Sequence, residues 1–542
     1  MMTLFRRRPS RKGDDTKRPV AWLMFMYFLS NVAVAGVAEE RRLFELQPMD
    51  RNEIQQKGAG GGYLATLLSN PAVQDIWLIN AQPQLVAASS PDLELPMPNG
   101  KSVRFALEHF SDAFDGMQGW QGGILRAPQA STALPSEIKV DPFNTISIVR
   151  DGDKLVGSLR VDGQLYHLEY LSPGQHALVR VDEAKLPPEG EPISSPKGDN
   201  LGLPLGAPKS AHSTIRLLMV TTDYPRERDP AIHARIVQAV EQANAVLRNS
   251  QVDITYEIAA IYDADYDETT KTDIEILNEA ANPQVPFGKN LAKVREVNRA
   301  DVVVVISDKG NVCGRAYRNA NKTNAFAIVM CYGSLGHELG HTLGADHNWA
   351  PGNAPGSPPY MWGYKLPAGR FRTQMSADCS PSCPQLGHFS NPRLTYQKEP
   401  LGTVEHNDVA RLLNERREAV EDFYPSPDSS VVVELFEGRN FTGRSCPIVL
   451  SRNETKTITE SGPDCADMGA RVQSARIIGA HEAVRLCFKA AVGNPAAACY
   501  SNIRSGDYSI KVLDSKQDLP EGVFIEQLSP PVLGNIRRLE YR

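Results

Sequence analysis

The sequence predicts a multidomain protein with a β-rich first part, an α/β middle part and an all-β C-terminal part. The chain has 542 residues, which at roughly 150 residues per domain is enough for three or four domains. Two stretches rich in Pro, Gly and Ser, at 187–208 and 425–430, divide it. All eight cysteines lie between Cys313 and Cys499, so the first part differs from the others in covalent chemistry.

The composition is that of ordinary globular protein. Hydrophobic residues make up 41% and charged residues 23%, which excludes a wholly disordered or collagen-like chain. The formal net charge is −6, so no overall basic field points to nucleic acid as a partner.

The N-terminus has the pattern of an export signal. An apolar run at 20–38 follows a basic leader, and small residues offer cleavage after Ala35 or Ala38. The basic residues are Arg6, Arg7, Arg8, Arg11, Lys12, Lys17 and Arg18. We therefore expect a signal peptide at 1–38 and a secreted protein, extracellular or periplasmic, that meets the membrane only through this signal. The alternative is an uncleaved anchor, because the run is just long enough to span a bilayer.

Residues 39–210 form the first part and its linker. Apolar and polar residues alternate from Ile146 to Tyr170, and Asp-Gly pairs at 151–152 and 162–163 punctuate the pattern. Such pairs are typical of tight hairpin turns, so we expect an antiparallel sheet. The stretch at 187–208 is predicted to be an exposed linker that proteases can cut.

Residues 211–424 alternate predicted strands and helices, which indicates an α/β layer with a mixed sheet. Four consecutive valines at 302–305 predict a strand buried on both faces. The expected strands are 215–220, 254–261, 301–306 and 325–331, and the expected helices are 230–249, one from about Ser334, and 408–423. Beyond the second linker, 431–542 has short strand patterns and turns with little helical periodicity, which predicts the all-β part.

The cysteines come in close pairs, and export permits disulfides. The pairs that we expect are Cys313 with Cys331, Cys379 with Cys383, Cys446 with Cys465, and Cys487 with Cys499. Spacing alone leaves this connectivity open, and free buried thiols are the alternative. No pair has the CxxC spacing of a zinc–thiolate site.

One short segment carries metal-ligand spacing. His337 and His341 are four residues apart, so on a helix they lie on one face and reach one ion. Gly344 lets the chain leave the helix and return with His347 as a third ligand. Three protein ligands leave a fourth position for water, which is typical of catalytic zinc. Glu338 can then stand beside that water as a base. The alternative is a polar helix face with satisfied histidines.

The eleven residues 337–347 resemble the zinc signature of the metzincin metallopeptidases. That family has a methionine turn under the metal, and Met375 in 371–379 fits it better than Met361. Many metzincins have Tyr two residues after this methionine, and here Ala377 stands there.

The similarity continues through 214–424 and is strongest to bacterial reprolysin-like and peptidyl-Asp metallopeptidase-like enzymes. It includes 300–304, 313–316, 388–392 and 408–423.

The resemblance implies a zinc endopeptidase acting on proteins or peptides. Zinc would activate water, Glu338 would accept its proton, and the substrate would lie along an edge strand, for which 325–331 is the candidate. It also implies a zymogen with 39–205 as propeptide. This segment has no Cys, which leaves steric blockage or a His or Asp ligand such as His176. The alternative is a folding-assistance domain that stays attached.

The C-terminal part resembles βγ-crystallin modules in its segment 436–443, with Phe436, Phe441 and Gly443 at the characteristic spacing. The place of that family's calcium motif, 470–475, begins with Ala and Arg, so Ca²⁺ is possible but unsupported. Two other functions compete with the secreted protease. One is a surface-binding or adhesion protein whose working part is the C-terminal module, and the other is a membrane-tethered protease with an uncleaved leader.

Overall fold

A computed structural model describes most of the chain before residue 425 and a set of strands after it. The described residues are 41–125, 136–194, 207–352, 357–366, 371–379, 383–424, 430–438, 443–451, 455–457, 465, 474–478, 484–489, 497–503, 506–508 and 538–541. The predicted signal peptide at 1–38 and most of the segment compared with a calcium motif, 470–473, lie outside them.

The first part is a nine-stranded antiparallel sheet in the order β1-β2-β9-β8-β7-β6-β5-β4-β3. Its strands are β1 (Phe44–Leu46), β2 (Val73–Ala81), β3 (Asp92–Pro96), β4 (Ser102–Phe114), β5 (Met117–Leu125), β6 (Val140–Asp151), β7 (Lys154–Val161), β8 (Gln164–Ser172) and β9 (Gln175–Val181). Both predicted hairpins are confirmed. Gly152 and Gly163 have φ of 60° and 82°, the left-handed backbone that Gly adopts readily. Two helices that the sequence analysis did not predict, α2 (Arg51–Gly58) and α3 (Gly62–Ser69), pack on β2 and β9.

The middle part is built on a six-stranded mixed sheet in the order β10-β14-β15-β13-β11-β12. Its strands are β10 (Ile193–Ser194), β11 (Ser213–Thr221), β12 (Ile254–Asp263), β13 (Val302–Ile306), β14 (Gly314–Arg318) and β15 (Phe326–Val329). Only β14 runs antiparallel to its neighbour β15 within this part. The valine strand β13 is fully buried, as predicted.

The expectation that residues 325–331 form an edge strand is wrong. β15 lies inside the sheet, between β13 and β14. A short strand, β14, was not expected and forms the edge of the middle part. The outer side of β14 is covered by β10, which comes from the segment before residue 195.

Helices cover both faces of this sheet. The long helix α5 (Ile232–Asn249) joins one core cluster with α8 (Leu335–Thr342) and α9 (Val409–Glu421). On the other face, α6 (Asp273–Ala281) and α7 (Pro286–Asn298) pack against the opposite sides of β11, β13 and β15. The predicted helices correspond to α5, α8 and α9, and Asp408 caps α9 by accepting from the Arg411 N–H.

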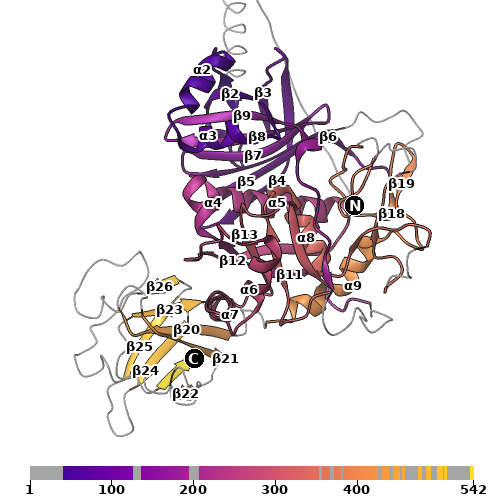
Figure 1. Ribbon diagram of the computed structural model, residues 1–542. Coiled ribbons are helices and arrows are strands. Elements are labelled where there is room, and N and C mark those ends of the chain that lie inside the picture. Colours follow the sequence, from indigo (N-terminus) through magenta and orange to yellow (C-terminus); the bar gives the residue numbers. More distant parts are fainter. Residues whose placement is uncertain are drawn as a thin grey trace, which may run out of the picture.

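The nine-stranded sheet packs directly on α5 (Figure 1). Val149, Val156 and Tyr170 of the sheet belong to the same buried cluster as the apolar face of α5. A buried ion pair joins the two parts at 2.5 Å, from Arg235 on α5 to Glu169 on β8. The first part therefore covers α5, the helix that shares its core cluster with α8.

The segment predicted as an exposed linker is only partly so. Residues 195–206 lie outside the described residues, but 188–194 run along β14, where Gly190 is buried. The sequence pattern correctly predicts irregular backbone for most of the described part of this segment. It gave no sign of this partner, because the pairing joins residues more than a hundred positions apart.

The described strands of the C-terminal part form two four-stranded sheets, ordered β21-β20-β23-β26 and β22-β27-β24-β25. They are β20 (Ser430–Phe436), β21 (Ser445–Ser451), β22 (Thr455–Thr457), β23 (Ser474–Ile478), β24 (Val484–Lys489), β25 (Ala497–Ile503), β26 (Gly506–Tyr508) and β27 (Arg538–Tyr541). The likeness to βγ-crystallins stays a prediction.

Three of the four predicted disulfides are present. They join Cys313 to Cys331, Cys379 to Cys383, and Cys446 to Cys465. Cys487 lies opposite Cys499 in the register of β24 and β25, and their disulfide stays a prediction.

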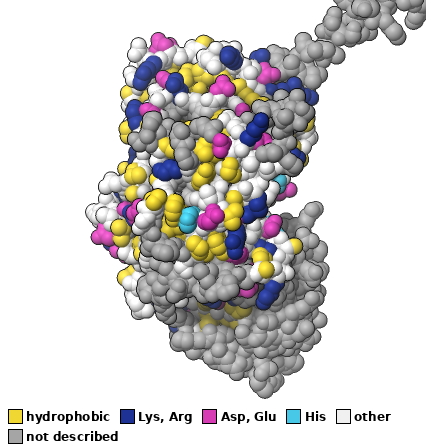
Figure 2. Space-filling view, turned by 90° about the vertical axis from the view of Figure 1, so that its right-hand side faces the viewer, with side chains coloured by type: hydrophobic (Ala, Val, Ile, Leu, Met, Phe, Trp, Pro, Cys, Tyr) yellow, Lys and Arg dark blue, Asp and Glu magenta, His cyan; other side chains and the backbone are white. Residues whose placement is uncertain are grey.

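No helix among the described residues is long and apolar enough to cross a membrane. On the face seen in Figure 2, basic and acidic side chains are interspersed among the described residues, without one extended patch of either sign.

Candidate active site

The helix α8 brings two of the predicted ligands and the predicted base together. His337, Glu338 and His341 are buried, each 0–1% exposed. Leu335 and Leu339 anchor the other side of the helix in the core. α8 is followed by Gly344, whose φ of 103° turns the chain, and β16 (Asp346–Asn348) then carries His347 back toward the helix.

The three histidines converge through their Nε2 atoms. His347 Nε2 lies 3.1 Å from His337 Nε2 and 3.2 Å from His341 Nε2. Nδ1 of His337 faces the carbonyl oxygen of Gln374 at 3.0 Å, and Nδ1 of His341 faces that of Ala345 at 2.8 Å. A carbonyl only accepts, so both Nδ1 atoms carry the proton and both Nε2 atoms present lone pairs.

This arrangement fits a tetrahedral metal ion. Lone pairs facing one another repel unless a cation lies between them. Nitrogen ligands at 2.0–2.1 Å from zinc would stand about 3.3 Å apart in a tetrahedron, close to the distances seen. Burial, with the neighbouring His337, holds the pKa of His341 well below its usual range and lowers that of His347 to about 4. Both imidazoles are therefore neutral near pH 7, as metal ligation requires.

Met375, the residue expected under the metal, packs against α8. It is 0% exposed, and a Cβ on Gly340 of α8 would come within 2.6 Å of its sulfur. Gly at 340 thus allows close packing of the turn under the helix. The residue before the methionine, Gln374, supplies the carbonyl that orients His337. Ala377, at the place where many metzincins have Tyr, is exposed.

Glu338 stands beside the histidines without a hydrogen-bond partner. Both of its carboxylate oxygens are buried and unpartnered. Burial raises the pKa of Glu338 well above its usual range, the Glu189 carboxylate raises it further, and Arg315 lowers it. The backbone of Gly314 leaves room for this side chain, because a Cβ there would meet Glu338 Oε1 at 2.5 Å.

Sequence reasoning missed Glu189, Gly314 and Arg315. Gly314 and Arg315 enter the sequence analysis only through the family resemblance of 313–316. A Gly at the start of a strand is nevertheless a signal that another group approaches the backbone closely. Glu189 was seen only as part of a linker. His176, named as a possible latency ligand, is used elsewhere, because its Nε2 accepts the Leu155 N–H at 3.1 Å inside the first sheet.

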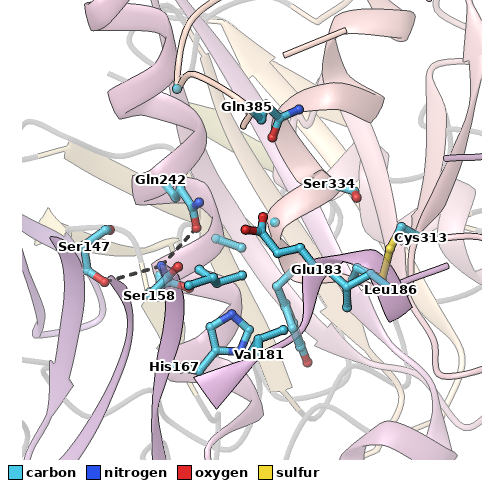
Figure 3. Close-up of a pocket in the computed structure, with 18 of the residues that line it drawn as sticks. Ser147, Ser158, His167, Val181, Glu183, Leu186, Gln242, Cys313, Ser334 and Gln385 are labelled. Carbon is cyan, nitrogen blue, oxygen red and sulfur yellow. Dashed lines mark hydrogen bonds between the residues drawn. A yellow bond between two sulfur atoms is a disulfide. The ribbon is translucent and has the colours of Figure 1, made fainter. Parts of the chain in front are cut away.

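A cavity of about 1040 Å³ lies between the first part and the site. Its lining includes His347, Arg372 and Ala377 of the middle part, and Glu183 and Glu189 from the chain that follows the first sheet. Figure 3 shows the cavity between Ser147, Ser158 and His167 of the first sheet, Gln242 of α5, and Ser334 and Cys313 near the site. The groups that could meet a substrate are thus covered by the first part of the chain.

Comparisons with known proteins identify the relatives of this chain. Residues 233–348 match the model of the reprolysin-like members of metallopeptidase family M12B. The chain is 30% identical over 411 residues to a peptidyl-Asp metalloendopeptidase of Xanthomonas campestris pv. campestris, a match that covers 72% of this chain and 95% of the relative. It is 31% identical over 404 residues to a peptidyl-Asp metalloendopeptidase of Stenotrophomonas maltophilia, covering 70% of this chain and 94% of the relative.

More than a quarter of this chain therefore lies outside each match, whereas the relatives are covered almost completely. The comparisons give the chain its class, which is metalloendopeptidase. It belongs to the family of bacterial reprolysin-like metallopeptidases that includes these relatives.

Proposed function

We propose that the chain is the secreted zymogen of a zinc endopeptidase in which His337, His341 and His347 hold the ion and Glu338 is the general base. The observation that carries the proposal is the convergence of three Nε2 atoms beside a buried carboxylate without partners. When bound, zinc would polarise the scissile carbonyl and lower the pKa of water in the site.

The chain's own residues would then move the proton. Glu338 accepts it from the attacking water and delivers it to the leaving nitrogen, which breaks the peptide bond. A carboxylate whose pKa is raised by burial is suited to both steps, since it must gain and lose a proton near neutral pH. Its lack of competing hydrogen bonds supports the same role.

We propose that the substrate lies along β14. The outer side of β14 carries unpaired backbone groups once β10 has left it, and an extended peptide adds to such an edge. The relatives are named peptidyl-Asp enzymes, and we propose that this chain also cleaves beside Asp. Arg372 supports this preference. It lines the cavity with His347, pairs with Asp378 at 3.4 Å, and is also attracted by the charges of Glu183 and Glu189.

The first part supports a zymogen, because it covers the cavity and β14. Release would need a cut between 194 and 213, and the predicted export signal would take the precursor out of the cell. The family membership favours an enzyme over a surface-binding protein as the main function.

The experiment compares Glu338→Gln with His347→Ala after a second protease has removed the first part from each variant. Glu338→Gln keeps the size of the side chain but cannot accept the proton, so hydrolysis should fall about 10²–10⁴-fold with zinc still bound. His347→Ala removes one of three ligands and should lower zinc content itself. Near-normal hydrolysis by the zinc-loaded Gln variant would contradict the mechanism.

A further inference from the structure

We propose that Glu189 is the fourth ligand of the metal in the uncleaved chain. The segment 188–194 that carries it would close the site until it is removed. The inference rests on the proposed function, because it needs a metal on the three histidines.

Backbone hydrogen bonds hold this segment along β14. The N–H of Cys313 donates to the carbonyl of Pro188 at 2.8 Å, and the N–H of Gly190 donates to the carbonyl of Gly314 at 3.0 Å. Farther on, Ile193–Ser194 pair in parallel with Tyr317 and Arg318. These bonds use the strand edge that a peptide substrate would need. The segment and a substrate therefore exclude each other.

Gly190 makes the close approach possible. A Cβ at this position would come within 2.5 Å of the Gly314 carbonyl oxygen, which is backbone and cannot easily move. The neighbouring carbonyl of Glu191 accepts from Arg315 Nη1 at 2.5 Å. Glu189 is thus fixed between two anchored residues, opposite the start of β14.

The two oxygens of the Glu189 carboxylate differ in their hydrogen-bond partners. Oε1 accepts from the Ser334 hydroxyl at 2.8 Å, whereas Oε2 is buried and has no partner. A Glu189 oxygen, a His337 ring nitrogen and a Glu338 oxygen all lie within 4.8 Å of one another. Glu338 is buried and Glu189 is half-buried. Two carboxylates so close repel each other, and a cation held by His337 would neutralise both.

Two nearby acidic residues, Glu191 in the segment and Glu183 before it, are placed differently. Glu191 Oε1 is 3.5 Å from His347 Nδ1, the ring nitrogen that faces away from the other histidines, and its side chain is 87% exposed. Glu183 pairs with Arg160 at 2.5 Å. Glu189 alone among these three belongs to a cluster with potential metal ligands. Glu191 contacts a proposed ligand, His347, so Glu183 offers the matched control.

The test measures the metal centre rather than hydrolysis. The full-length chain carries Glu338→Gln, which prevents self-processing, and is loaded with Zn²⁺ or Co²⁺. Zinc transfer to a chromophoric chelator and the visible spectrum of the cobalt form are compared for Glu189→Ala, Glu189→Gln and the control Glu183→Ala. Outer partners of metal ligands are already worth 10–100-fold in affinity, so loss of a direct ligand should speed zinc transfer at least about tenfold. The cobalt spectrum should change with both Glu189 variants and stay as in the parent with Glu183→Ala.

Two results would count against the account in different ways. Equal zinc transfer and equal spectra for the parent and both Glu189 variants would overturn the role of Glu189 and leave the histidine site standing. A parent chain that binds neither ion would overturn the proposed function itself. Glu189→Gln keeps the size of the side chain, so it still reports if Glu189→Ala fails to fold.

Discussion

Gly314→Ala should impair catalysis without removing the metal. The new methyl group would lie 2.5 Å from Glu338 Oε1 and 2.6 Å from its Cγ, where ordinary contacts need about 3.5 Å. Glu338 is 0% exposed, so it cannot swing out to solvent. The side chain or strand must therefore move by about 1 Å.

A displacement of this size has a known scale of effect. Misplacing a catalytic group by about 1 Å can cost about 10²-fold in rate, and complete loss of a general base costs about 10²–10⁴-fold. We expect kcat of the processed enzyme to fall within this range. Zinc content should be unchanged, because the three atoms nearest to the added methyl all belong to Glu338 and none to a histidine.

The assay is hydrolysis of a short fluorogenic peptide by processed enzyme of measured zinc content. Gly333→Ala is the matched control, since a Cβ at Gly333 meets nothing within 4 Å. If Gly314→Ala acts through the base, it should add little to Glu338→Gln in the double variant. Normal hydrolysis by Gly314→Ala, or a full additional loss in the double variant, would refute the reasoning.

Three further predictions concern the contact between the first part and α5, the dependence of stability on pH, and substrate specificity. Glu169→Ala should weaken the binding of the cleaved first part to the enzyme about 10–100-fold, because a charged hydrogen bond of about 1.5–3 kcal/mol is lost. Arg235 keeps its other partner, Asp229, at 2.6 Å. Unchanged co-purification of the first part with the enzyme would contradict this prediction. Burial lowers the pKa of His388 to about 4. The unfolded chain, with a pKa of about 6.5, then takes up a proton first, so stability should fall by up to about 3 kcal/mol as pH drops from about 6.5 to 4. His388→Gln should flatten the dependence of urea midpoint on pH, and an identical slope would count against it. Arg372→Gln should reduce the kcat/KM ratio of Asp over Asn peptides at least about tenfold, and an unchanged ratio would remove Arg372 from specificity.

Much of the middle part followed from local pattern. The valines of β13 form a strand that is covered on both faces. In α5 and α9, apolar residues recur with the helical period of 3.6, and these residues form the buried faces of the two helices. The site histidines were predictable because their spacing is local to one helix and one turn. Two missed helices carried signals too, since Thr272 and Glu275 form a capping box on α6 and Pro286 begins α7.

The parts that escaped prediction depend on contacts distant in sequence. Whether a strand lies at an edge is decided by what pairs beside it, so β15 could not be told from β14 by its residues. Glu189 and Gly314 lie far apart in the sequence, and only the tertiary fold brings their segments together. Gly190 shows the same limit, because its need for Gly arises from the Gly314 carbonyl and not from its own φ.

The central claim is that one metal on three histidines drives hydrolysis. The most direct test strips the processed enzyme with a chelator and measures peptide hydrolysis as zinc is added back. The account predicts no hydrolysis by the stripped enzyme and recovery that saturates at one zinc per chain for the parent, with no recovery at that ratio for His347→Ala. Full hydrolysis by the metal-free enzyme, or equal recovery by His347→Ala, would contradict it.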